Sequence, residues 1–122
     1  MNKKVKILVI DDDVQVLDVV QLTLDCVGYD VDKTTSGTKA LELAKNKQYD
    51  LIVSDIKMPE ISGVDIIKKL KENNYNTHFI LMTGFSGEYS EQSVLALGID
   101  AYLEKPFNIQ LLIEIVESVL RV

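Results

Sequence analysis

The sequence is poor in the residues that mark several common classes of protein. Its 122 residues include one cysteine, two prolines and no tryptophan. A single cysteine excludes an internal disulfide, so the fold has to be stabilised by a hydrophobic core. Because Cys26 lies in the apolar-periodic stretch VVQLTLDCVG, we expect it to be a small core residue and not a nucleophile.

Long hydrophobic runs and an excess of positive charge are also absent. No apolar run approaches the roughly 20 residues that a membrane-spanning helix needs. The Lys-rich start leads into an apolar run that is too short for a signal peptide. The formal net charge of -6 argues against a nucleic-acid-binding protein, whose affinity comes mainly from Lys and Arg contacts to phosphates. We therefore predict a cytoplasmic chain with no membrane anchor and no direct contact to nucleic acid.

Short apolar runs alternate with longer segments whose apolar residues recur every three or four positions. The runs predict strands at 5–10, 29–33, 50–54, 78–82 and 100–104, and the segments predict helices at 14–27, 37–47, 62–73, 88–97 and 108–121. Strict alternation implies parallel strands joined by right-handed crossovers, with helices on both faces of one sheet. The length suits a single domain over residues 1–122.

Polar side chains follow four of the predicted strands. Asp11 and Asp12 come after the first strand, Asp55 after the third, Thr83 after the fourth and Lys105 after the fifth. Ligands of such sheets bind at the carboxyl ends of the strands, where the winding direction reverses. Asp13, which precedes the apolar segment VQVL, is instead predicted to be the N-cap of the first helix.

Three neighbouring carboxylates repel one another unless a proton or a cation compensates their charge. Because every ligand would be an oxygen atom, the ion of choice is a hard divalent cation, Mg²⁺. A metal, a carboxylate, a hydroxyl and a lysine are together the parts of a phosphoryl-transfer site.

Four motifs, ILVIDDD, DLIVSDIKMPEISG, LMTG and YLEKPF, occur in the order and at the separations found in one family. The whole chain resembles the receiver domains of two-component response regulators, of which the chemotaxis regulator is the minimal form. The resemblance implies an α/β, flavodoxin-like, doubly wound five-stranded parallel sheet of order 2-1-3-4-5 with five helices. It also implies a signalling switch that catalyses only its own phosphorylation and dephosphorylation, and is not otherwise an enzyme.

The resemblance assigns a role to each of the polar residues. Asp55 accepts a phosphoryl group from a sensor histidine kinase or a phosphotransfer protein. Asp11, Asp12, Asp55 and the backbone carbonyl of Lys57 hold Mg²⁺, with Asp12 the more direct ligand of the acidic pair.

Three further residues would transmit the change. Thr83 would donate its hydroxyl to the phosphoryl group and Lys105 would pair with it, aimed by a cis Lys105–Pro106 peptide. Tyr102 would move inward with Thr83. The face built from 88–97, 100–104 and 108–121 would then bind a downstream effector or output domain, or form a homodimer.

Three positions depart from the family pattern. Gly84 stands where Ala is more usual and is expected to loosen the loop after Thr83. Lys57 and Phe85 occupy positions that influence how water reaches the phosphoryl group, and we hypothesise that they slow self-dephosphorylation.

Two alternatives remain at the level of sequence. ILVIDDDVQ and FILMTG approach two motifs of haloacid-dehalogenase-type phosphatases, which would be phosphorylated on Asp11 and not on Asp55. However, Gln15 stands where Thr or Val is expected, and no late acidic pair follows. A degenerate receiver that acts as a phosphorylation-independent interaction module is the other alternative.

Overall fold

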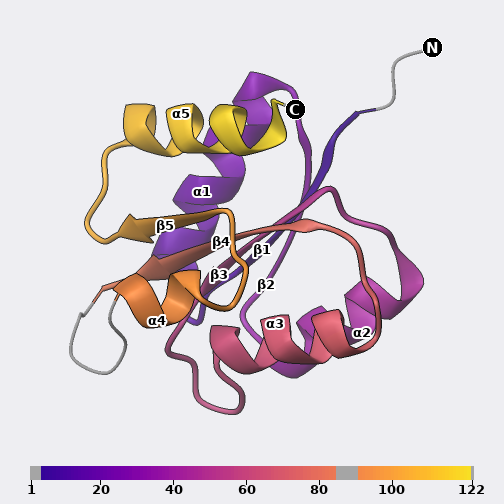
Figure 1. Ribbon diagram of the computed structural model, residues 1–122. Helices are drawn as coiled ribbons and strands as arrows, with labels where there is room; N and C mark the ends of the chain where they lie inside the picture. Colours follow the sequence, from indigo (N-terminus) through magenta and orange to yellow (C-terminus); the bar gives the residue numbers. More distant parts are fainter. Residues whose placement is uncertain (1–3, 85–90, 122) are drawn as a thin grey trace.

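The computed structural model describes residues 4–84 and 91–121 and forms one parallel sheet covered by helices (Figure 1). The strand order is β2-β1-β3-β4-β5, and every neighbouring pair is parallel. The strands are β1 (Lys6–Ile10), β2 (Asp30–Thr34), β3 (Leu51–Asp55), β4 (His78–Thr83) and β5 (Ala101–Glu104). The helices are α1 (Val14–Val27), α2 (Gly37–Asn46), α3 (Gly63–Glu72), α4 (Glu91–Leu95) and α5 (Ile109–Leu120). The predicted α/β, flavodoxin-like fold of order 2-1-3-4-5 is confirmed.

The sheet separates two hydrophobic clusters. Helices α1 and α5 cover one face, where Leu17, Val20 and Leu112 pack against alternate residues of the strands. Helices α2, α3 and α4 pack on the other face, where Ile66 and Phe79 are among the buried residues. The central strands β1 and β3 bury nearly all of their residues, as strands covered on both faces should.

Local sequence signals fix the ends of the helices. The Asp13 side chain accepts a hydrogen bond from the backbone N–H of Gln15, so the predicted N-cap is confirmed. The first helix ends at Gly28, whose φ of 110° lies in the left-handed region that glycine adopts without strain. Ser36, Ser62 and Asn108 cap α2, α3 and α5 in the same way as Asp13 caps α1.

Two expectations from the sequence need correction. Cys26 is exposed and is not a core residue, because α1 is apolar on its outer side as well as on its buried side. The fourth helix ends at Leu95 and not at 97, since the backbone then continues in turns that reach Gly98 with a φ of 85°. Residues 88–90 of that predicted helix lie outside the described residues. Over 4–84 and 91–121, no helix has the length and apolar character needed to cross a membrane.

Candidate functional site

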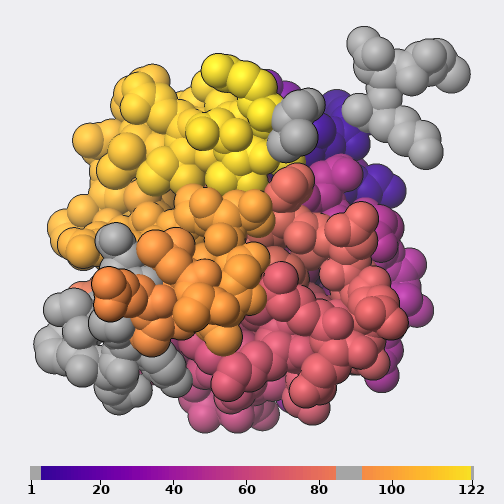
Figure 2. Space-filling view, viewed as in Figure 1, coloured from indigo at the N-terminus to yellow at the C-terminus, as the bar shows by residue number. Residues whose placement is uncertain are grey.

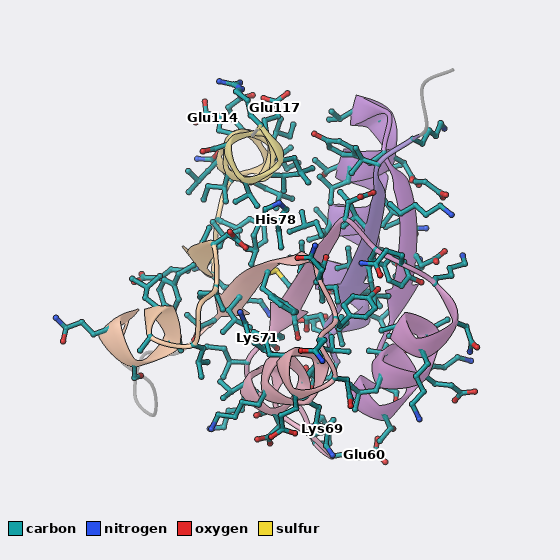
Figure 3. All side chains as sticks on the ribbon, turned by 45° about the vertical axis from the view of Figure 1, so that its right-hand side comes forward. Glu60, Lys69, Lys71, His78, Glu114 and Glu117 are labelled. Atoms are coloured by element: carbon teal, nitrogen blue, oxygen red, sulfur yellow. The ribbon has the colours of Figure 1, made fainter. Side chains whose placement is uncertain are left out.

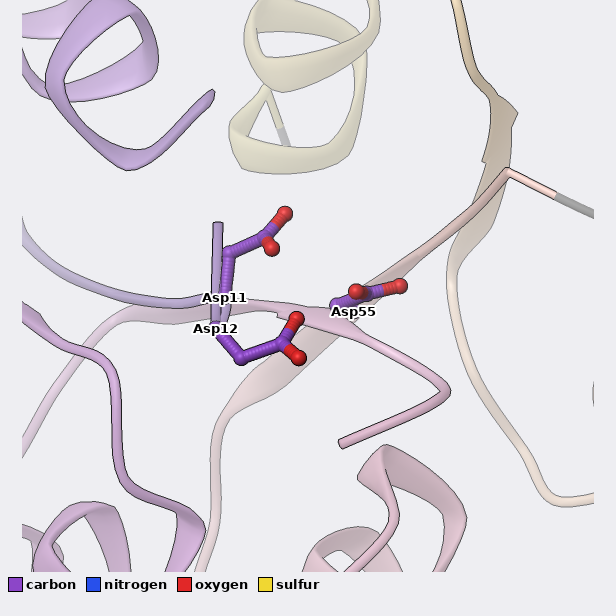
Figure 4. Close-up of side chains that lie close together, drawn as sticks. All are labelled: Asp11, Asp12 and Asp55. Carbon is purple, nitrogen blue, oxygen red and sulfur yellow. The ribbon is translucent and has the colours of Figure 1, made fainter. Parts of the chain in front are cut away.

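The carboxyl ends of β1 and β3 bring three acidic side chains together. Asp11 and Asp12 follow β1, and Asp55 is the last residue of β3. One carboxylate oxygen from each of the three residues lies within 4.8 Å of the others (Figure 4). Asp11 and Asp55 are buried, whereas Asp12 is exposed at the mouth of the cluster. The acidic cluster predicted from the sequence is therefore present.

Lys105 reaches this cluster from the segment after β5. Its ammonium nitrogen lies 2.6 Å from Asp11 Oδ2 and 3.4 Å from Asp55 Oδ2. The Lys105–Pro106 peptide is cis, as predicted. The backbone N–H of Lys105 also donates to the carbonyl of Thr83 at 2.7 Å, which connects this segment to the end of β4.

The electrostatics of the site are dominated by burial and by like charges. Burial and the neighbouring charge of Asp11 raise the pKa of Asp55 to about 6, although Lys105 opposes this change. Burial lowers the pKa of Lys105, but the hydrogen bond to Asp11 and the charge of that carboxylate outweigh this effect, so the Lys105 pKa is raised. The ammonium of Lys105 thus lies beside a cluster of three carboxylates and offsets part of their charge.

The donor atoms of the cluster fit a divalent cation. Three carboxylate groups converge on one point from two strand ends, and one of them remains accessible to solvent. Oxygen donors and excess negative charge are what hard divalent cations select. The acidic triad could therefore hold a metal.

A second bond orients Asp11. Its Oδ1 accepts a hydrogen bond from the backbone N–H of Asp13 at 2.9 Å, while its Oδ2 pairs with Lys105. Asp13 in turn caps α1. The three consecutive aspartates thus serve the acidic cluster and the start of a helix.

The remaining predicted residues lie around the cluster. Thr83 ends β4 and is buried, Tyr102 lies on β5 and is half-buried, and Lys57 is exposed in the β3–α3 loop. A Cβ at Gly84 would make only ordinary contacts with Lys105, so the space next to Thr83 would admit an alanine. Phe85 lies outside the described residues.

Sequence reasoning missed a groove beside the site. It has a volume of about 460 Å³ and lies between α1 and the segment that carries Lys105. Its apolar walls include Val16, Val19 and Phe107. The sequence feature that could have indicated this groove is Val19, an apolar residue that lies outside the buried helical spacing of α1. In the structure its side chain is 48% exposed.

A family model described as "Response regulator receiver domain" matches residues 7–117. Among curated proteins, "Response regulator SaeR" of Staphylococcus epidermidis and that of Staphylococcus aureus are each 38% identical over 102 residues. The match covers 84% of this chain but 44% of each relative, so the chain spans less than half the length of those proteins.

Solved structures share the fold over nearly the whole chain. The Francisella response regulator 1452 receiver domain is 32% identical, with a TM-score of 0.89 and coverage of 97% of this chain and 98% of that one. Vibrio cholerae CheY4 is 28% identical, with a TM-score of 0.88 and coverage of 96% and 99%. Thermotoga maritima TrrA, solved in complex with Mg²⁺-BeF, is 32% identical, with a TM-score of 0.83 and coverage of 94% and 98%.

Proposed function

The chain belongs to the family of response regulator receiver domains, and from this premise we propose that it accepts a phosphoryl group on Asp55. Receiver domains are signalling switches rather than enzymes. The observation that carries the proposal is the cluster of Asp11, Asp12 and Asp55 with Lys105 beside it. We also propose that one receiver domain accounts for residues 1–122. The predicted cytoplasmic location stays a prediction.

Asp11, Asp12, Asp55 and the backbone carbonyl of Lys57 would hold Mg²⁺. When bound, this ion supplies neutralising charge to the oxygens of the transferred phosphoryl group. The Thermotoga relative was solved with Mg²⁺ and a beryllium fluoride group, which supports the same assignment here.

The chain's own side chains would carry out the transfer. A carboxylate oxygen of Asp55 attacks the phosphorus of a phosphohistidine, the P–N bond breaks, and the histidine leaves with the electron pair of that bond. The product is an acyl phosphate on Asp55. Lys105, already 3.4 Å from Asp55, would exchange Asp11 for a phosphoryl oxygen, and the Thr83 hydroxyl would donate to another.

The change would then reach the face formed by α4, β5 and α5, whose surfaces adjoin in Figure 2 (orange and yellow). Thr83 pairs with Glu104 in the β4–β5 register, and its carbonyl accepts from the Lys105 backbone. A shift of Thr83 toward the phosphoryl group would therefore act on β5, where Tyr102 lies. This face would bind a downstream effector or output domain, or a second copy of the chain.

The family implies a histidine kinase as the partner on the donor side, and the groove beside Lys105 supports docking of a kinase or phosphotransfer protein there. On this proposal a donor histidine would approach Asp55 past α1, where Val14 is 55% exposed and Val19 48% exposed. Apolar side chains exposed at the edge of a site are typical of surfaces that bind another protein.

Intact-mass measurement after incubation with acetyl phosphate and Mg²⁺ tests the proposal. The wild type should gain one phosphoryl group, and Asp55→Asn should gain none. Phosphorylation of Asp11 would point to the phosphatase alternative, which the family assignment already opposes. A wild type that gains no phosphate would favour the phosphorylation-independent interaction module.

A further inference from the structure

The loop between β3 and α3, residues 56–62, connects the proposed phosphoacceptor to the rest of the fold. It follows Asp55 directly and includes Lys57, whose carbonyl is a proposed metal ligand. The backbone N–H of Ile56 donates to Met82 at 3.0 Å, and the N–H of Gly63 donates back to Ile56 at 2.8 Å. The two ends of the loop are thus bonded to each other, and its path depends on how closely α3 can approach β3.

Gly63 allows that close approach. A Cβ at this position would overlap the backbone carbonyl oxygen of Asp55 and would lie 3.0 Å from Ser54 Oγ. The Ser54 hydroxyl donates to the same Asp55 carbonyl at 2.9 Å. Because backbone cannot rotate away as a side chain can, any larger residue at 63 has to displace the start of α3 from Asp55. The short distance between α3 and the Asp55 backbone therefore requires glycine at position 63.

Gly37, the first residue of α2, faces Ile61, near the end of the loop that leads into α3. A Cβ there would overlap Ile61 Cγ2 and would lie 3.3 Å from the Ile61 carbonyl oxygen. A chain of hydroxyl contacts reinforces this approach: Ser36 Oγ lies 2.9 Å from Thr38 Oγ1, which donates to Glu60 at 3.4 Å. Glu60 lies below α3 in Figure 3, at the edge of the molecule. Helix α2 therefore supports the loop although it contributes no residue to the acidic cluster.

We propose that Gly37 and Gly63 are positioning residues that hold the 56–62 loop in the geometry needed for Mg²⁺ binding. The inference rests on the proposed function, because it assumes that Asp55 and the Lys57 carbonyl bind the ion. Displacement of the loop would move the Lys57 carbonyl away from the carboxylates while the carboxylates themselves remain. Loss of a group that orients the ligands of a metal typically lowers metal affinity by roughly 10–100-fold.

The test compares Gly37→Ala and Gly63→Ala with Gly28→Ala as the matched control. Gly28 has no neighbour within 4 Å of a new Cβ, but its φ of 110° makes alanine unfavourable. The control thus lowers stability without touching the loop. Titration with Mg²⁺ alone, followed through the backbone amide NMR signals of Asp11 and Asp12, gives the dissociation constant of each variant.

We expect the Mg²⁺ dissociation constant to rise roughly tenfold in Gly63→Ala and several-fold in Gly37→Ala, and to stay within twofold of wild type in Gly28→Ala. In assays with acetyl phosphate, Gly37→Ala and Gly63→Ala should be phosphorylated more slowly than wild type, and this difference in rate should become smaller at saturating Mg²⁺. A rescue variant, Gly37→Ala with Ile61→Leu, removes the Cγ2 atom that the new Cβ would meet and should restore affinity. It also keeps the inference testable if Gly63→Ala does not fold.

Unchanged Mg²⁺ affinity in both folded loop variants, or equal loss in Gly28→Ala, would overturn the inference. A wild type that binds Mg²⁺ but takes no phosphate would overturn the proposed function alone, because the comparison of affinities still stands. A wild type that binds no Mg²⁺ would overturn both.

Discussion

The ammonium of Lys105 lies 2.6 Å from a carboxylate oxygen of Asp11, although β3 and β4 separate the strands that these two residues follow. Asp11 is fully buried and the Lys105 side chain is 18% exposed, so this ion pair is partly shielded from water. The pair occupies the position from which Lys105 would turn to a phosphoryl group on Asp55. If Asp55 is phosphorylated as proposed, Lys105 would therefore have a different partner in each of the two states.

Substitution Lys105→Met should destabilise the protein when metal is chelated. Without the ammonium, three carboxylates repel one another, and we expect the free energy of unfolding to fall by about 1–3 kcal/mol. Mg²⁺ should then raise the melting temperature more in Lys105→Met than in wild type, because the ion replaces the missing charge.

Thermal unfolding with EDTA and with Mg²⁺ measures this difference. Lys33→Met is the matched control, since it breaks an ion pair with Asp18 in which the side chains are 36% and 57% exposed. Such exposed pairs are worth roughly 0.5 kcal/mol and should not respond to Mg²⁺. An equal gain from Mg²⁺ in wild type and Lys105→Met would contradict the prediction.

Asp55 should make stability depend on pH in metal-free buffer. Its pKa is raised to about 6 in the folded protein, so the folded state binds more protons than the unfolded state between about pH 4 and pH 6. The free energy of unfolding should therefore fall as pH rises through this window, by on the order of 3 kcal/mol.

Asp55→Asn should remove that fall, because an amide does not titrate. Urea unfolding at several pH values in the presence of EDTA checks the sign and the window. Asp25→Asn, a change on the exposed side of α1, should leave the wild-type profile in place. A profile for Asp55→Asn that follows wild type would show that another group is responsible.

The alternation of strands and helices and the composition of the site could be predicted from the residue pattern, and the strand order from the resemblance to receiver domains. The contacts between distant side chains could not be predicted. Apolar runs and helical spacing are local, and the strand ends converge wherever the topology is parallel, so Asp11, Asp12 and Asp55 were placed together. The pairing of Lys105 with Asp11 was missed because the resemblance describes Lys105 with a phosphoryl group present. Local patterns also give no indication that His78 Nδ1 lies 3.3 Å from a carboxylate oxygen of Asp100, which directly precedes β5.

A partly buried network at the opposite end of the sheet was also missed, and it makes a prediction of its own. Tyr49 precedes β3, is 1% exposed, and donates its hydroxyl to Asp32 at 2.6 Å. Lys47 donates to the same carboxylate oxygen. Tyr49→Phe should lower the free energy of unfolding by about 1–2 kcal/mol, because Asp32 loses a donor, and should leave phosphorylation by acetyl phosphate unchanged.

The same network has a pH signature. Burial raises the pKa of Asp32, but hydrogen bonds from Lys47 and Tyr49 outweigh this and hold it below its ordinary value. The stabilisation is therefore fully present above about pH 4 and is lost as pH falls through the lowered folded-state pKa. Acid unfolding of Tyr49→Phe should show a smaller loss over this range than wild type. A loss of equal size would mean that the hydroxyl does not support Asp32.

Thr83→Ala should separate phosphorylation from the conformational response. Thr83 is 7% exposed and is not one of the proposed metal ligands. Asp55 should therefore still take phosphate from acetyl phosphate. The change in the Tyr102 amide NMR signal on phosphorylation should, however, be largely lost, because the hydroxyl that draws the end of β4 toward the phosphate is absent. Thr83→Ser, which keeps the hydroxyl, should restore it. A Tyr102 response of wild-type size in Thr83→Ala would exclude this route.

The exposed apolar residues of α1 predict that a protein donor and a small donor respond differently to one substitution. Val19 lines the groove beside Lys105 but lies outside the acidic cluster. Val19→Lys should therefore slow phosphoryl transfer from a histidine kinase that phosphorylates the wild type, by roughly tenfold or more, because a charge is placed in an apolar contact. The reaction with acetyl phosphate, which needs no docking surface, should proceed at the wild-type rate.

Val27→Lys is the control for this experiment, because Val27 is the last residue of α1, 39% exposed, and lies at the end of the helix far from Asp13 and the acidic cluster. If kinase transfer falls in Val19→Lys alone, the donor contacts the half of α1 beside the site. An equal fall in both variants would extend the contact along the whole helix. No fall in either variant would mean that the donor approaches Asp55 from another side, and the groove would then have no part in recognition.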